Sequence, residues 1–112
     1  MELVEWQDFE KIELRVGTVI SAKMNDSARK KAYTLEVDFG PEIGLKKSSA
    51  QITELYDAES LIGRQVVAVV NFPPKQIGKM ISEVLITGFP DEQGNVVLCS
   101  PDHKVPNGTK LF

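Results

Sequence analysis

The residues of this chain whose types and spacing could do chemistry are lysines with polar neighbours, and that chemistry is anion binding. No acidic residue occurs between Glu59 and Glu83, and within this gap the segment VVNFPPKQIGKMIS at positions 69–82 carries Lys75 and Lys79. The whole chain is nevertheless acidic, with a formal net charge of −3. Because ammonium groups on an exposed loop attract phosphates and carboxylates, this segment indicates a surface that meets anions.

Two further groups of residues accompany this segment. One lies in LKKSSAQI at positions 45–52, which is too polar for a core strand, and the other is a basic run at positions 29–31. The candidate binding set is Lys46, Lys47, Ser48, Ser49, Asn71, Lys75, Gln76, Lys79, Met80 and Ser82. A secondary basic patch consists of Arg29, Lys30 and Lys31. The alternative interpretation is that these are ordinary solvated lysines on loops.

The sequence contains few residues that could support catalysis or bind a metal. His103 is the single histidine and lies in a loop, and Cys99 is the single cysteine and lies in the apolar run VVLC. One histidine and one cysteine cannot make a zinc site, and Cys99 has no neighbouring base to activate it as a nucleophile. No glycine-rich phosphate loop is present. We therefore expect a binding protein without catalytic residues, bound metal or cofactor.

Length and composition predict one domain over residues 1–112. A chain of 112 residues with 42% hydrophobic content suits a single compact core. The acidic N-terminus MELVEWQDFEK does not resemble a secretory signal, and no apolar run approaches the roughly 20 residues that span a bilayer. A single unpaired cysteine suits a reducing compartment. We expect a cytoplasmic protein that does not insert into membranes.

Alternating apolar and polar residues predict the β-strands that must position the binding residues. The segment IELRVGTVISAKM predicts one long strand that bends at Gly17, and YTLEVDFG alternates without interruption. Between Thr53 and Gly63 the period changes to that of a short helix, with Thr53 or Asp57 as its N-cap. The predicted strands cover residues 12–24, 33–40, 45–52, 64–72, 83–89 and 96–99.

This order of elements predicts an all-β protein with an OB fold. The OB fold is a five-stranded small barrel, and here one short helix lies between strands 3 and 4, with extensions at both termini. An immunoglobulin-like sandwich has a similar number of strands but no place for that helix. The third strand and the loop between the fourth and fifth strands would be neighbours in such a barrel, so the candidate binding residues should share one face.

Five segments in this order resemble a known family. They are LRVGTVISA (14–22), YTLEVDFG (33–40), KKSSAQI (46–52), VVNFPPKQIG (69–78) and SEVLITGF (82–89). Together they resemble the EMAP-type tRNA-binding domain family and, within it, the CsaA group of small export-related chaperones. The resemblance runs from about Phe9 to the C-terminus. It implies an OB fold, a homodimer joined through the terminal extensions, and binding without catalysis.

The resemblance also implies partners and a site. The resemblance implies an RNA site that includes the loop after the fourth strand and the serine of a Ser-x-Gly-Met motif. In this chain Ser82 matches the serine, whereas Val84 and Leu85 stand in place of Gly and Met. NDSARKKAY at positions 25–33 replaces a segment that contains His-Pro. These departures favour modest affinity. The implied partners are tRNA or other structured RNA and unfolded or precursor polypeptides; a dedicated tRNA-binding protein acting in trans, with no chaperone role, is the alternative.

Apolar residues in the loop at 77–81 would serve a peptide-binding chaperone. Ile77, Met80 and Ile81 lie beside Lys75 and Lys79, so an unfolded segment with acidic flanks could compete with RNA for one face. The alternative is that Ile77 and Ile81 only close the end of the barrel.

Large apolar residues at both termini support the dimer independently. A single small barrel would struggle to bury all of them, and we expect them at a subunit interface. The predicted interface residues are Trp6, Phe9, Leu111 and Phe112. The alternative is that Trp6 and Phe9 fold back over their own barrel in a short turn capped by Asp8.

Overall fold

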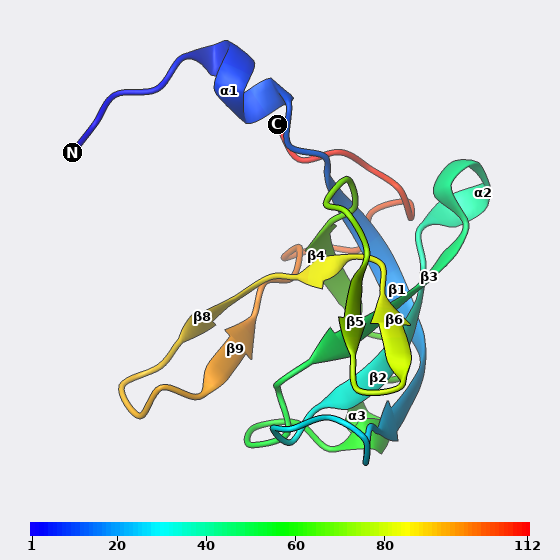
Figure 1. Cartoon of the computed structure of the whole chain (residues 1–112). Coiled ribbons are helices and arrows are strands. Elements are labelled where there is room, and N and C mark those ends of the chain that lie inside the picture. The colour runs from blue at the N-terminus through cyan, green and yellow to red at the C-terminus, as the bar shows by residue number, and fades with distance from the viewer.

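A five-stranded antiparallel sheet forms the centre of the molecule (Figure 1). The computed structural model describes residues 1–112. The strand order is β3-β2-β1-β4-β7, so the first strand lies in the middle of the sheet. The strands are β1 (Leu14–Met24), β2 (Tyr33–Asp38), β3 (Leu45–Ala50), β4 (Gln65–Val69) and β7 (Leu85–Ile86). This sheet confirms the predicted small barrel of the OB type.

Residues 82–84 close the barrel against the outer edge of β3. The Glu83 N–H donates to the Lys47 carbonyl at 2.7 Å, and the Lys47 N–H donates to Glu83 Oε1 at 3.0 Å. Two residues along, the Ser49 N–H donates to Ser82 Oγ at 3.0 Å. These bonds satisfy the edge of β3 that would otherwise be free to pair with another strand. The third strand and the segment after the fourth therefore lie side by side, as the sequence predicts.

The core follows the alternation of β2. Leu35, Val37 and Phe39 are fully buried, and the helix α3 (Ala58–Leu61) adds Leu61. The helix is shorter than the predicted 53–63, and its N-cap is Asp57, whose Oδ1 accepts from the Ser60 N–H at 2.8 Å. Hydrogen bonds from Ser60 hold the pKa of Asp57 below its ordinary value. The predicted helix is therefore present between β3 and β4, with one of its two predicted caps.

The irregularity in β1 does not lie at Gly17, where the sequence pattern predicts it. The β1–β2 register shifts between Val19 and Ser21, whereas Gly17 pairs regularly with Val66. A Cβ at Gly17 would come within 2.7 Å of the Phe39 ring. Glycine is needed at this position because the ring packs directly against the backbone, not because the strand bulges there.

Two small hairpins leave the barrel. Residues predicted as loop form β5 (Lys75–Ile77) and β6 (Met80–Ser82), which turn at Gly78. The predicted strand 83–89 is divided at Thr87 into β7 and β8 (Gly88–Pro90), and β8 pairs with β9 (Val96–Leu98) in a hairpin that projects from the barrel (Figure 1). The β5–β6 hairpin lies over β3, so it carries its lysines to the predicted face.

The remaining helices are short. A single turn, α2 (Gly40–Ile43), lies between β2 and β3, and α1 (Trp6–Glu10) stands apart from the barrel with the C-terminus beside it (Figure 1). Neither these helices nor α3 has the length and apolar composition that crossing a membrane requires.

Candidate functional site

Two adjoining clefts occupy the face formed by β3 and the β5–β6 hairpin. The hairpin cleft has a volume of about 480 Å³, and the loop cleft has a volume of about 530 Å³. Both are lined by Ser49, Gln51 and Ile77, so they form one continuous surface, which we call the cleft face. The remaining lining of the hairpin cleft is Phe72, Pro73, Lys75, Ser82, Glu83, Val84 and Leu85. The remaining lining of the loop cleft is Ala28, Arg29, Lys30, Ala32, Gln76 and Gly78.

The loop after β1 is fixed to the turn of the β5–β6 hairpin. The Lys79 N–H donates to Ser27 Oγ at 2.9 Å, and Asn25 Nδ2 donates to the Ile77 carbonyl at 3.3 Å. Gly78 has a φ of +63°, and a Cβ there would lie 2.4 Å from Ser27 Oγ. Only a glycine allows this contact. The loop brings its basic residues to the hairpin, so the secondary patch predicted at residues 29–31 borders the main one.

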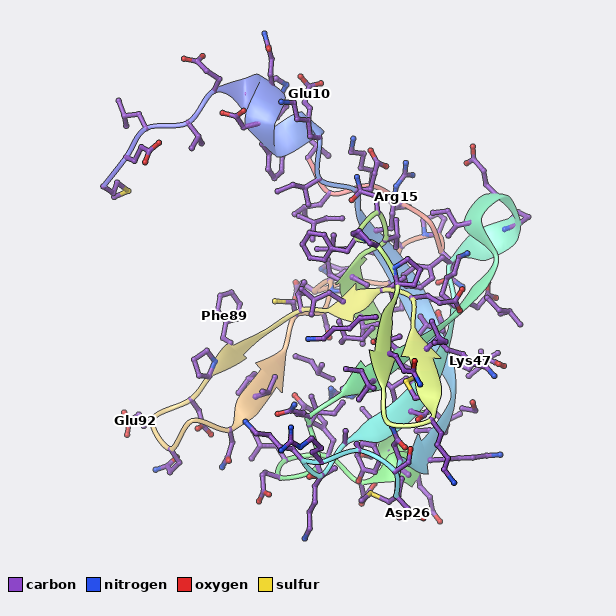
Figure 2. The ribbon with its side chains drawn as sticks, viewed as in Figure 1. Glu10, Arg15, Asp26, Lys47, Phe89 and Glu92 are labelled. Carbon is purple, nitrogen blue, oxygen red and sulfur yellow. The ribbon has the colours of Figure 1, made fainter.

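Unpaired cations surround the cleft face. Lys75, Lys79 and Lys47 are exposed, and none of them has a carboxylate within 4.0 Å. Figure 2 shows Lys47 pointing away from the barrel on the side of β6. Lys46 lies 3.9 Å from Glu83, which is the one carboxylate lining the face. Since Glu83 is shared between Lys46 and the Lys47 backbone, the face presents mostly positive charge to solvent.

Three predicted binding residues instead serve the fold. Ser48 is fully buried because the alternation of β3 turns it inward, and its hydroxyl donates to the Val84 carbonyl at 2.9 Å. The prediction that Ser48 contacts a ligand is therefore wrong. The side chain of Asn71 accepts from the Glu13 N–H and donates to the Lys11 carbonyl, which fixes the N-terminal segment instead of facing the clefts.

The third of these residues, Ser82, lines the hairpin cleft but uses its hydroxyl to accept from the Ser49 N–H. Of the apolar hairpin residues, Ile77 and Met80 are half-buried, and Ile81 is exposed. Ile77 lines both clefts, so it is part of the cleft face and not merely a plug at the barrel end. Gln76 is exposed and donates to the Gly78 carbonyl within its own hairpin.

Two residues that were not predicted, Phe72 and Gln51, also belong to the cleft face. Phe72 lines the hairpin cleft with 50% of its surface exposed, and Gln51 lines both clefts. A signal for Phe72 was present, because the residue before a proline is held extended and Pro73 and Pro74 follow it directly. The two prolines therefore restrict the backbone of the loop that carries this half-exposed ring.

The predicted interface residues gather at one end of the molecule. Trp6 and Phe9 lie with ring centroids 5.3 Å apart, and Trp6 is 61% exposed, so it does not fold back over the barrel. The C-terminal segment is attached beside them, since the Leu111 N–H donates to the Leu14 carbonyl at 2.8 Å. Phe112 is almost fully exposed. Large apolar side chains from both ends of the chain are therefore exposed here.

An ion pair joins the two termini. Lys110 Nζ lies 2.9 Å from Glu13 Oε2, and Arg15 contacts the other oxygen of the same carboxylate at 2.6 Å. Hydrogen bonds from Lys110 and then from Arg15 hold the pKa of Glu13 below its ordinary value of 4.5. Charge at Glu13 therefore helps to keep the C-terminal segment beside β1.

The single histidine and the single cysteine form no cluster that could hold a metal ion. His103 is exposed and lies 3.3 Å from the carboxylate of Asp102, and Cys99 is half-buried. No group of three histidine, cysteine, aspartate or glutamate side chains is arranged to hold a metal ion.

Comparison with known proteins adds a family and solved relatives. Residues 14–110 match the family described as "Putative tRNA binding domain". The crystal structure of chaperone CsaA from Bacillus anthracis str. Ames is similar over 99% of this chain and 100% of that one, with 50% identity and a TM-score of 0.92. The CsaA chaperone protein from Picrophilus torridus gives 45% identity over 98% of this chain and 100% of that one, with a TM-score of 0.91.

A curated relative is the methionine–tRNA ligase of Pyrococcus horikoshii. The identity is 34% over 99% of this chain, but the chain spans only 15% of the length of that enzyme. The similarity to the ligase therefore covers its tRNA-binding portion, and the matched family is one of binding domains rather than of catalysts.

Proposed function

The chain belongs to the tRNA-binding domain family and is of the CsaA type, and from this premise we propose that it binds structured RNA of the tRNA class through the cleft face. The observation that carries the proposal is the docking of the loop at residues 25–31 on the β5–β6 hairpin. It places Arg29 and Lys30 in the cleft that adjoins Lys75. A continuous cationic surface about a barrel face is the arrangement with which OB folds follow a nucleic-acid backbone.

The size of the cationic surface sets the expected strength of binding. The logarithm of the binding constant falls with the logarithm of the salt concentration, with a slope of about −0.9 for each phosphate contact. If roughly three to five cations meet phosphates, affinity falls roughly 40- to 500-fold between about 50 and 200 mM salt. Binding by one subunit would then be modest at cellular ionic strength. Shape, rather than base sequence, would decide which folded RNA fits.

A homodimer would recover affinity. We propose that Trp6, Phe9, Leu111 and Phe112 meet a second subunit, because Trp6, Leu111 and Phe112 are exposed and the half-buried Phe9 lies against Trp6. Two cleft faces on one dimer would bind a large RNA with an increased effective concentration and without any new contact.

A second candidate function is the capture of unfolded or precursor polypeptides. It is favoured by the apolar part of the hairpin cleft, where Phe72 and Leu85 are each about half exposed, and by the two similar structures named as CsaA chaperones. Such a chaperone would act in protein export from the cytoplasm, and neither function requires catalysis. The alternative is a tRNA-binding protein with no chaperone role.

Competition distinguishes these functions. Fluorescently labelled tRNA is bound to the protein and then challenged with a denatured polypeptide and, separately, with the same polypeptide after folding. Displacement by the denatured form alone supports one shared face for both ligands. Saturable tRNA binding that the denatured chain does not reduce restricts the cleft face to RNA, and absence of any tRNA binding contradicts the proposed function.

A further inference from the structure

We propose that the hairpin cleft binds one unpaired nucleotide of the RNA, with its base stacked on Phe72 and its phosphate at Lys75. The inference rests on the RNA binding proposed above and specifies what part of the RNA the site holds. It assigns a role to Phe72 and Gln51, which belong to neither the core nor the cationic rim.

The hairpin cleft contains one accessible aromatic ring. Half of the Phe72 surface is exposed, and no other aromatic residue lines either cleft. Bases stack on aromatic side chains in OB folds, and this contact tolerates any base because each one has a π-face. In a duplex the faces of the bases are covered by their neighbours, so Phe72 can stack only on a base that has left a helix or never entered one.

The size and polarity of the hairpin cleft suit a single nucleotide. A volume of about 480 Å³ lies within the range of small-ligand pockets and is too small for a folded partner. Among the residues that line the cleft, Ser49 and Gln51 have side chains that make no hydrogen bond within the protein. A free carboxamide offers donors and an acceptor side by side, which suits the edge of a base.

The charges around the hairpin cleft favour a polyanion. Lys75 lies at the hairpin cleft, and Arg29 and Lys30 line the adjoining loop cleft, whereas the single carboxylate, Glu83, is occupied by its contacts with Lys46 and the Lys47 N–H. A nucleotide in the hairpin cleft would carry its neighbouring phosphates towards these cations. A polyanion fits this distribution better than an unfolded peptide, whose backbone carries no repeating charge.

The test compares an RNA stem-loop with a blunt duplex of the same stem, using the full chain. The loop carries 2-aminopurine, whose fluorescence falls when the base stacks. Phe72→Leu keeps an apolar side chain but removes the aromatic face, and Phe89→Leu is the matched control because Phe89 is also exposed but lies on the projecting β8–β9 hairpin (Figure 2). Urea unfolding of each variant establishes that the fold is retained.

We expect Phe72→Leu to weaken stem-loop binding by about 5- to 150-fold and to abolish the fluorescence change, while duplex binding and Phe89→Leu remain at wild-type levels. Wild-type stem-loop binding by Phe72→Leu would overturn the nucleotide site but leave the proposed RNA function intact. If Phe72→Leu binds the stem-loop as the wild type does but no longer captures a denatured polypeptide, the nucleotide site is also overturned. The cleft would then be a peptide site. Failure of the wild-type protein to bind either RNA would overturn both.

Discussion

The hydroxyl of Ser27 accepts a hydrogen bond of 2.9 Å from the backbone N–H of Lys79, across 52 positions of sequence. This bond holds the loop after β1 against the turn of the β5–β6 hairpin. It makes one surface of two basic segments that are far apart in the chain, so the proposed binding of RNA by the cleft face should depend on this contact.

Gly78→Ala should separate the loop from the hairpin. The new Cβ would meet Ser27 at 2.4 Å, and the positive φ adds about 1–2 kcal/mol of backbone strain. We expect lower stability in urea and, because Arg29 and Lys30 are displaced, a salt slope of RNA binding that is smaller by about 2.

Gly94→Ala is the matched control for this substitution, since Gly94 has a φ of +83° but open space around it. It should lose stability without any change in RNA affinity. A Gly78→Ala protein that binds RNA with the wild-type salt slope would contradict the role given to the docked loop.

Ser48 and Ser49 should behave in opposite ways. Ser48→Ala removes a buried hydrogen bond to the Val84 carbonyl, so we expect the free energy of unfolding to fall by about 1–3 kcal/mol with RNA affinity unchanged. Ser49→Ala should leave stability unchanged and reduce affinity, because its side chain lines both clefts. Urea titration and RNA titration of both variants check the pair, and a loss of affinity in folded Ser48→Ala would reverse the assignment.

Ser48 and Ser49 also show which features of the structure can be predicted from the sequence. The alternation of β2 and the Asp57 cap could be predicted because both depend on neighbours within a few residues. The inward direction of Ser48 could not be inferred as readily, since a strand written KKSS shows no apolar alternation. Its burial depends on the Val84 carbonyl, 36 positions away.

The same limit applies to the hairpin and the loop. Strands of three residues, such as β5 and β6, carry too little pattern to be distinguished from a loop that follows two prolines. Likewise, the position of Arg29 beside the hairpin follows from the Ser27–Lys79 contact and not from the composition of its own segment. The sequence identifies the type of each candidate residue. The direction of its side chain and its neighbours in space depend on the fold.

Removing terminal apolar residues should weaken the dimer. Deletion of Phe112, or Trp6→Ala, should lower the dimer fraction in analytical ultracentrifugation, because each removes an exposed ring from the proposed interface. Leu55→Ala is the control, since Leu55 is exposed in the segment before α3, at the opposite end of the molecule from α1 (Figure 1). An unchanged dimer fraction in both terminal variants would rule out this interface.

The attachment of the C-terminal segment should weaken in acid. The pKa of Glu13 is lower in the folded protein than its ordinary value of 4.5, so its stabilising contribution is present above that pH and is lost as the pH falls through the folded value. Glu13→Gln should remove this pH dependence.

At neutral pH, Glu13→Gln should also speed amide exchange at Leu111, measured by NMR. Glu10→Gln is the control, because only the backbone carbonyl of Glu10 meets Lys110 (Figure 2 labels Glu10 on α1). Equal exchange at Leu111 in the wild type and in Glu13→Gln would show that the ion pair does not hold the segment.

The most direct test of the account is a titration of bulk tRNA at about 50 and 200 mM salt with the wild type, Lys75→Glu/Lys79→Glu and the control Lys104→Glu. We predict saturable wild-type binding that weakens roughly 40- to 500-fold between the two salt concentrations. The double variant should lose binding at both concentrations with its fold intact, and Lys104→Glu should stay close to the wild type because Lys104 lines neither cleft. A folded double variant that binds tRNA as tightly as the wild type would contradict the assignment of RNA binding to the cleft face.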